Sequence, residues 1–202
     1  MPESHKYYII YKPYNMVSQF VSPDPVRLLG DLDFDFPEGT HAIGRLDNHS
    51  EGLLILTTNK KVTRLLFEGE KPHKRTYLVQ VKNVVSAERL ETLRAGVDIE
   101  IKDSSIYKAV PVDVQLAKAP DNFQELQPHY HNVPHSWLQI TLIEGKYHQV
   151  RKMVKAIHHP CKRLIRTSIE NLTLGQLQPG DVVELEEQDF FEKLGIDYQA
   201  HL

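Results

Sequence analysis

The pattern of apolar and polar positions along the chain predicts a mixture of short strands and helices. Short apolar runs bounded by turn residues indicate buried strands, and apolar positions that alternate with polar ones indicate half-buried strands. By these signs strands are expected at residues 8–11, 53–56, 76–81, 110–116, 138–142, 164–169 and 182–185. Few neighbouring strands are joined by a segment as long as a helix. The pattern therefore favours an α+β fold with a largely antiparallel sheet over a doubly wound fold.

Three helices are expected between these strands. Asn59 can cap a first helix, and Ser86 can cap a second one that ends near Gly96. A third helix is indicated by apolar residues at positions i, i+3, i+4 and i+7, namely Val150, Met153, Val154 and Ile157. Residues 118–136 are rich in proline, histidine and polar residues, and we interpret them as a long excursion within one domain.

Composition places the chain among ordinary globular proteins. It has 202 residues, of which 41% are apolar and 25% charged, with a formal net charge of −3. The only cysteine is Cys161, so no disulfide can form within the chain. No secretory signal is visible and the apolar runs are short, so we expect a cytoplasmic protein with no membrane association.

Charge is distributed unevenly along the sequence. Residues 145–169 contain seven Lys or Arg residues and no acid, whereas seven acids fall between Asp181 and Asp197. On the third predicted helix the cationic stripe lies opposite the apolar one, and it consists of His148, Arg151, Lys152 and Lys155. A merely solvated face usually mixes charges of both signs, so this stripe favours a surface that binds a polyanion.

A carboxylate with possible chemistry lies in the segment Arg45-Leu46-Asp47. This segment follows an apolar stretch and precedes a polar turn and a buried strand, so Asp47 can project into a cleft. It could be a nucleophile, a general base or a metal ligand. Taken alone, the more common role of an Asp in a turn is to hydrogen-bond its own backbone.

Metal and nucleotide motifs are weak. The two groups His129, His131, His135 and His158, His159, Cys161 match no zinc pattern, and no phosphate-binding glycine loop is present. We therefore expect no metal and no cofactor, and we interpret Cys161 as a small packed residue. A metal-dependent hydrolase that uses the first histidine group is a rival hypothesis.

Five motifs follow one another in order: residues 12–18 (K-P-Y-N-M-V-S), 44–57 (G-R-L-D-N-H-S-E-G-L-L-I-L-T), 75–77 (R-T-Y), 144–153 (E-G-K-Y-H-Q-V-R-K-M) and 174–180 (L-G-Q-L-Q-P-G). Together they resemble the motifs of the RsuA/RluE-type pseudouridine synthases, over residues from roughly 6 to 187. Two departures stand out. Asn15 takes the place of a motif glycine, and Tyr147-His148 takes the place of Asn-Arg.

The resemblance implies an α+β catalytic fold with a mixed, mainly antiparallel sheet in two lobes and a cleft between them. It implies one catalytic domain over residues 1–202, with its core at roughly 6–187 and no N-terminal S4 domain. The chain is most similar to the RluE branch, which acts on large-subunit ribosomal RNA. The implied partner is therefore 23S rRNA or a precursor particle. The enzyme is expected to be a monomer. A non-catalytic rRNA-binding or ribosome-assembly protein on the same fold is the alternative.

The resemblance also implies roles for individual residues. Asp47 would attack the ribose or act as the base that starts cleavage, Arg151 would pair with it and favour its ionised form, and Tyr77 would stack on the uracil. Arg45 would fill the gap left by the displaced uridine. The implied RNA contacts are Lys146, His148, Lys152 and Lys155.

Overall fold

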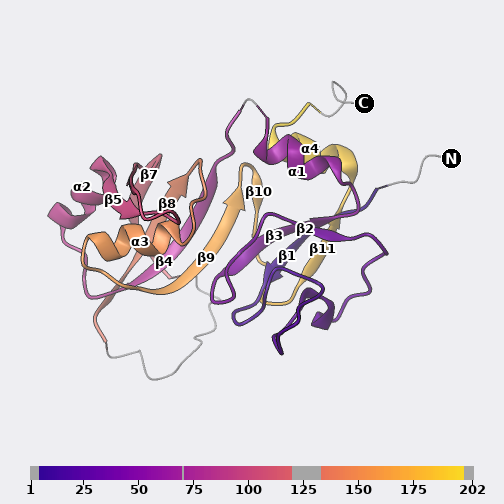
Figure 1. Cartoon of the computed structure of the whole chain (residues 1–202), viewed down its shortest axis with the longest axis horizontal. Coiled ribbons are helices and arrows are strands. Elements are labelled where there is room, and N and C mark those ends of the chain that lie inside the picture. Colours follow the sequence, from indigo (N-terminus) through magenta and orange to yellow (C-terminus); the bar gives the residue numbers. More distant parts are fainter. Residues whose placement is uncertain (1–4, 70, 120–132, 198–202) are drawn as a thin grey trace. The chain divides into compact units, whose positions relative to one another are not determined.

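The computed structural model describes residues 5–69, 71–119 and 133–197. The chain divides into two compact units. The first unit comprises residues 1–75 and 165–202, and the second comprises residues 76–164. The chain leaves the first unit in strand β4 (Arg75–Lys82) and returns to it in strand β9 (Cys161–Ile169) (Figure 1). Each unit is described separately below.

The first unit is built around two central strands, β1 (Tyr7–Lys12) and β3 (Glu51–Thr57), which pair antiparallel. The strand order is β11-β1-β3-β9, and β3 runs parallel to β9. The remaining elements of this unit are β2 (His41–Ile43), β10 (Leu172–Thr173), β11 (Val182–Leu185), α1 (Lys61–Phe67), α4 (Glu187–Leu194) and the 3-10 helix η1 (Leu29–Asp31).

Both faces of β1 are buried, which is why it carries an unbroken apolar run. On one face Tyr8 packs edge-on against Phe34 and Phe36. On the other face the ring of Tyr7 stacks on Phe190 of α4 at 4.7 Å between centroids. The acidic C-terminal segment thus contributes a helix, α4, that buries its aromatic residues on the sheet.

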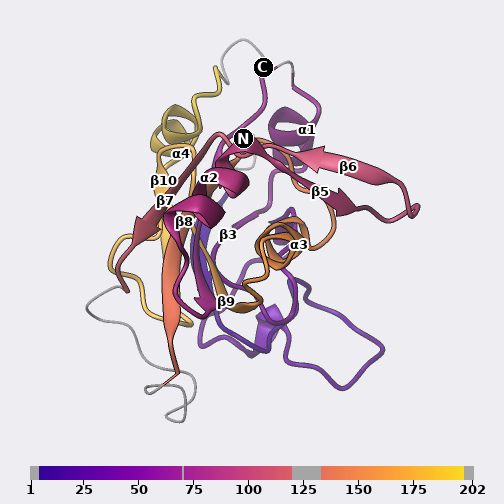
Figure 2. The same ribbon diagram turned by 90° about the vertical axis from the view of Figure 1, so that its left-hand side faces the viewer.

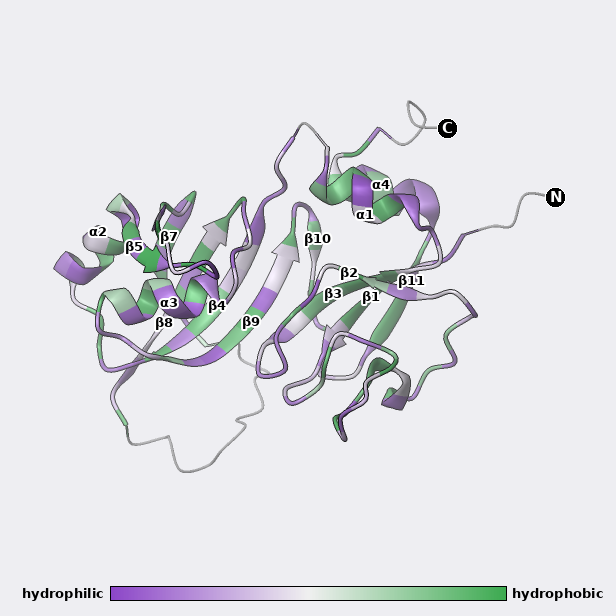
Figure 3. Ribbon diagram, viewed as in Figure 1, coloured by the Kyte–Doolittle hydropathy of each residue, from purple (hydrophilic) through white to green (hydrophobic). Residues whose placement is uncertain are grey.

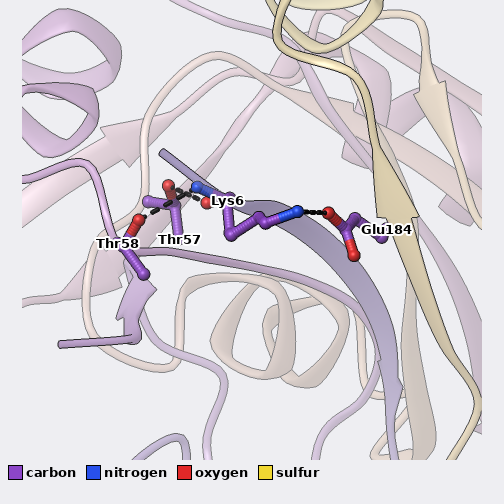
Figure 4. Close-up of polar contacts among 4 residues, drawn as sticks. All are labelled: Lys6, Thr57, Thr58 and Glu184. Atoms are coloured by element: carbon purple, nitrogen blue, oxygen red, sulfur yellow. Dashed lines mark hydrogen bonds and ion pairs between the residues drawn. The ribbon is translucent and has the colours of Figure 1, made fainter. Parts of the chain in front are cut away.

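Polar contacts fix the start of β1 (Figure 4). The amide of Lys6 donates to Thr58 Oγ1 at 2.9 Å, and Thr57 Oγ1 donates to the carbonyl of Lys6 at 2.6 Å. The Lys6 ammonium pairs with Glu184 Oε1 at 2.5 Å, and this carboxylate raises the pKa of Lys6. Because Lys6 and Glu184 are both exposed, the pair contributes little to stability.

The second unit has the strand order β4-β8-β7, with β7 (Asp113–Ala117) antiparallel to β8 (His135–Leu142). A separate hairpin pairs β5 (Val97–Glu100) with β6 (Ile106–Ala109). Helix α3 (Gln149–Ala156) contacts β5, and α2 (Ala87–Ala95) contacts β7 (Figure 2). The core of this unit combines apolar residues of β4 and β8 with the stripe of α3. Hydrophobic and hydrophilic bands along α3 are visible in Figure 3.

The α+β class is confirmed, with nine strands in a mixed and mainly antiparallel sheet. Ser86 caps α2 as predicted, since its side chain accepts a hydrogen bond from Arg89 N. The apolar stripe of α3 is buried at all four predicted positions, Val150, Met153, Val154 and Ile157. No helix among the described residues is both long and apolar enough to cross a membrane.

The strand predicted at 110–116 is wrong in its start and in its buried face. The strand begins at Asp113, and of the four predicted apolar positions only Val114 is buried. Val110, Val112 and Leu116 are about half exposed. Arg94 of α2 reaches this strand at Val114, where its Nε donates to the Val114 carbonyl at 2.8 Å. The β5–β6 hairpin and α4 were not predicted.

Candidate active site

Asp47 lies in the first unit, in the turn that joins β2 to β3. Its side chain is half-buried, and its carbonyl accepts a hydrogen bond from Ser50 N at 2.9 Å. Strand β3 begins directly afterwards, at Glu51. The turn therefore places a carboxylate at the end of the central strand pair, where the adjoining strand limits how far its backbone can move.

A buried serine holds the residue before Asp47. The amide of Leu46 donates to Ser18 Oγ at 2.9 Å, and the same hydroxyl donates to the Leu46 carbonyl at 2.9 Å. Both backbone groups of Leu46 are thus bonded to one side chain from the segment that follows β1. A hydroxyl can serve both because it is donor and acceptor at once.

A buried lysine holds the residue after Asp47. The Lys12 ammonium has no exposed surface and donates to the carbonyls of Pro13 at 2.8 Å, Met16 at 2.6 Å and Asn48 at 3.5 Å. Three acceptors match the three hydrogens of an ammonium. Burial lowers the pKa of Lys12 to about 8, while the carboxylates of Glu51 and Asp47 act to raise it. Lys12 is therefore mostly charged at neutral pH.

Strand pairing brings Lys12 to this position. In the antiparallel register Lys12 lies opposite Gly52, and Gly52 also pairs with Arg166 of β9 on its other side. Gly52 has φ +98°, and a Cβ there would lie 2.3 Å from the Arg166 carbonyl oxygen. Only glycine fits between these backbones, which explains why the second residue of β3 is a glycine.

The departure at Asn15 has a structural explanation. Asn15 has φ 56°, in the left-handed region that glycine adopts freely and asparagine tolerates better than most residues. Its Oδ1 accepts a hydrogen bond from Asn48 Nδ2 at 3.1 Å. Residues 12–18, which we call the clamp segment, therefore contact the residues on both sides of Asp47.

Arg45 is exposed in the same unit. Its Nη2 donates to Gln19 Oε1 at 2.6 Å, so the guanidinium is held next to the clamp segment. On the other side of the turn, the rings of Tyr14 and His49 stack at 5.2 Å between centroids.

The other two predicted catalytic residues belong to the second unit. Tyr77 lies in β4 and is only 8% exposed, packed in the apolar core of that unit. Arg151 lies on α3 and is half-buried, with Nη1 3.6 Å from Cys161 Sγ. The pairing of Arg151 with Asp47 and the stacking of Tyr77 on uracil stay predictions.

The predicted RNA contacts also belong to the second unit, and they differ in their surroundings. Lys155 is exposed on α3, whereas Lys152 Nζ donates to the Glu100 carbonyl at 2.6 Å and so links α3 to β5. His148 precedes the helix as its N-cap, with φ 54°. Lys146 Nζ lies 5.1 Å from the centroid of the Tyr107 ring.

Cys161 is a packed thiol, in agreement with its interpretation from the sequence. Burial raises its pKa to about 11, although the Arg151 guanidinium acts to lower it. A thiol with this pKa is almost entirely protonated at neutral pH, so it is a poor nucleophile.

The sequence contains two groups of histidines that could have been metal ligands. His129 and His131 lie outside the described residues. His159 is buried, and its Nδ1 lies 2.9 Å from the carbonyl oxygen of Lys82, which indicates a structural role. Among residues 5–69, 71–119 and 133–197 no three His, Cys, Asp or Glu side chains are grouped so as to hold a metal ion.

Lys12 and Ser18 contact the residues next to Asp47, and the sequence alone suggested no role for either of them. They appeared only as part of the first motif. The motif shows how far apart Lys12 and Ser18 are in the sequence. Their burial and their contacts with the Asp47 turn, however, depend on the pairing of β1 with β3. A lysine is rarely fully buried, so burial at Lys12 could not be expected from composition.

Comparison with known proteins gives consistent matches. The model of the RNA pseudouridylate synthase family matches residues 6–156. A ribosomal large subunit pseudouridine synthase E from Vibrio parahaemolyticus is 37% identical, over 91% of this chain and 75% of the relative. One from Xanthomonas axonopodis pv. citri is 34% identical, over 85% of this chain and 89% of the relative.

Solved structures match as well. A crystal structure of pseudouridylate synthase superposes with a TM-score of 0.72 at 25% identity, covering 95% of this chain and 74% of that one. A Cbf5-Nop10-Gar1 complex matches with a TM-score of 0.59 at 12% identity, over 96% of this chain and 57% of that one, and shows a shared fold alone.

The clamp can be tested through Ser18. Replacing it (Ser18→Ala) removes the partner of two backbone groups of Leu46, so the free energy of unfolding should fall by about 1–3 kcal/mol. The matched control is Ser22→Ala. The Ser22 hydroxyl accepts from the exposed backbone amide of Asp24, so its loss should change the free energy of unfolding by less than about 0.5 kcal/mol. Urea unfolding of both variants makes the comparison. Equal effects would contradict the role given to Ser18.

The protonated thiol of Cys161 predicts slow alkylation. A pKa of about 11 in place of 9.0 leaves roughly 100-fold less thiolate at pH 8. Iodoacetamide should therefore modify the native protein at least about 100-fold more slowly than the same protein unfolded in urea. A native rate equal to the unfolded rate would show a reactive thiolate instead.

Proposed function

The chain belongs to the RNA pseudouridylate synthase family, and on that premise we propose that it isomerises one specific uridine of large-subunit ribosomal RNA, in 23S rRNA or a precursor particle. The relatives from Vibrio and Xanthomonas that bear this activity in their names match most of the chain. The observation that carries the proposal is the Gly44-Arg45-Leu46-Asp47 turn, inside the matched residues, with the neighbours of Asp47 bonded on both sides.

The reaction is a rearrangement within one nucleotide. The bond between ribose C1′ and uracil N1 breaks, the ring turns, and a bond forms between C1′ and C5. The hydrogen at C5 is lost as a proton, and N1 takes up a proton. Atoms and electrons balance without an oxidant, a reductant or a group donor, so we propose that the enzyme needs no metal or organic cofactor.

Asp47 is proposed as the catalytic carboxylate. It either attacks the ribose or removes the proton that starts cleavage, and both routes need its oxygens at a fixed place beside the sugar. The hydrogen bonds of Ser18 to Leu46 and of Lys12 to Asn48 support this role, because they limit the motion of the turn.

Arg151, Tyr77 and Arg45 are proposed as the groups that complete the site. Arg151 pairs with Asp47 through charge-assisted hydrogen bonds. Tyr77 faces the uracil, and Arg45 takes the place of the displaced uridine once the base has left its stack. The hydrogen bond from Arg45 to Gln19 would then be exchanged for contacts with RNA.

The cations of the α3 region are proposed to bind the RNA backbone, namely Lys146, His148, Lys152 and Lys155. Of these, Lys155 is the most direct phosphate contact because its side chain is exposed, whereas Lys152 also holds the Glu100 carbonyl. We further propose that the enzyme acts as a monomer in the cytoplasm, where its RNA substrate is made.

Asp47→Asn should abolish the reaction while leaving the RNA bound. The amide keeps the shape of the side chain but can neither attack nor accept the proton, so the rate should fall by about 10⁴ or more. The assay is release of tritium from rRNA labelled at uridine C5. Asp33→Asn, an exposed acid of the same unit, is the control and should keep the parent rate. A tenth of the parent rate in Asp47→Asn would rule out the assigned role. The same assay distinguishes an enzyme from a non-catalytic rRNA-binding protein, because only an enzyme releases tritium.

Arg151→Lys should keep the charge and lose the catalytic geometry. A lysine lacks the planar fork that grips a carboxylate with two hydrogen bonds, so Asp47 should be misplaced and the rate should fall by about 10². The measurement is the single-turnover rate at saturating enzyme, which removes the contribution of binding. Lys155→Ala, on the same helix, should weaken binding and keep this rate. If the two variants behave alike, Arg151 is only a phosphate contact.

A further inference from the structure

An exposed aromatic ring stands on the loop between β8 and α3. Tyr147 is 59% exposed, and its ring stacks on His148 with centroids 3.8 Å apart and planes 18° apart. The ammonium of Lys152 lies 5.5 Å from the centroid of the Tyr147 ring. The ring is thus oriented by two neighbours although most of its surface remains open.

The loop that carries this ring is held from within. Gln149 is buried. Its side-chain Nε2 donates to Glu144 Oε1 at 2.6 Å, and its side-chain Oε1 accepts from Lys146 N at 2.9 Å. A backbone bond from Gln149 N to the Lys146 carbonyl, at 3.0 Å, closes the loop. The conformation of Tyr147 and His148 is therefore set before any ligand arrives, which reduces the ordering that binding requires.

The backbone at His148 is also unusual. Its φ of 54° lies in the left-handed region, which non-glycine residues rarely adopt. Such conformations persist where the surrounding structure enforces them, and they gather at functional sites. Here the conformation accompanies the stacking of the histidine ring on Tyr147. The chain has this ring pair where the family motif has Asn-Arg.

We propose that the Tyr147–His148 pair is a stacking surface for one unpaired base of the RNA substrate. The inference rests on the proposed function, since it adds a specificity contact to that reaction. RNA is read mainly at unpaired nucleotides, whose bases stack on aromatic side chains. The same loop and helix supply positive charges for the adjoining phosphates, from Lys146, Lys152 and Lys155. The nearby carboxylate of Glu144 accepts a hydrogen bond from Gln149.

The test is an abasic scan of the RNA. The probe is the shortest large-subunit rRNA fragment in which the parent enzyme forms pseudouridine, with one abasic nucleotide placed in turn at each unpaired position other than the target. Dissociation constants are measured for the parent, Tyr147→Leu, Tyr147→Phe and the control Ile106→Ala. Ile106, at 68% exposure, is an apolar residue of the same unit, on β6, and is slightly more exposed than Tyr147.

The parent should lose about tenfold in affinity at one abasic position, the value of one stacked base. Tyr147→Leu should bind the intact RNA about tenfold more weakly and lose nothing further at that position. Tyr147→Phe, which keeps a ring, and Ile106→Ala should match the parent throughout. If Tyr147→Leu keeps the parent affinity, or if its loss multiplies with the abasic loss at every position, the stacking surface is wrong.

Failure of the proposed function gives a different result. At saturating enzyme the parent and the control Ile106→Ala should both convert the target uridine completely, because Ile106 lies outside the proposed surface. If the parent forms pseudouridine in no large-subunit rRNA fragment, the proposed function is wrong, and the inference that depends on it is wrong as well.

Discussion

The buried ammonium of Lys12 is the constraint on which the geometry of the first unit depends. A charge in a protein interior is tolerated only when hydrogen bonds and opposite charges replace its hydration. Lys12 meets this requirement with three backbone carbonyls and with the nearby carboxylates of Glu51 and Asp47. To satisfy the ammonium, the chain after β1 and the turn before β3 must close around the same point.

The closing of these two segments gives Asp47 its fixed position. Ser18 bonds the residue before it and Lys12 the residue after it, while Asn15 joins the side chain of Asn48. Gly52 then allows β3 to lie between Lys12 and Arg166 without a side chain in the way. The motifs at residues 12–18 and 44–57 are thus two halves of one arrangement, although η1 and β2 lie between them in the sequence.

Much of the fold could be predicted because its signals are local. The period of Val150, Met153, Val154 and Ile157 specified α3, and Ser86 marked the start of α2. The prediction of a strand at 110–116 failed because three of its four apolar positions, Val110, Val112 and Leu116, are about half exposed, and cover by other elements cannot be read from alternation. Helix α4 was missed because its acids obscure a stripe that packs on Tyr7, a residue at the opposite end of the chain.

In the candidate site, too, some residues could be found from local sequence signals and others could not. Asp47 could be found from its motif, since a Gly-Arg-Leu-Asp segment before a buried strand is specific. The roles of Lys12 and Ser18 could not be predicted, because they arise from pairing between strands about 40 residues apart. Tyr147 and His148 were visible only as a departure from a motif, and their stacked geometry comes from the left-handed backbone at His148.

The central claim is that Lys12 and Ser18 act together to hold Asp47. The direct measurement is a double-mutant cycle on the single-turnover rate of pseudouridine formation, with Lys12→Met, Ser18→Ala and the double variant. If the turn is held only while both residues bond it, removing either one already frees Asp47, and removing the second adds little. The double variant should then be at least about tenfold faster than the product of the two single effects requires. Single effects that simply multiply would show that Lys12 and Ser18 act independently of each other.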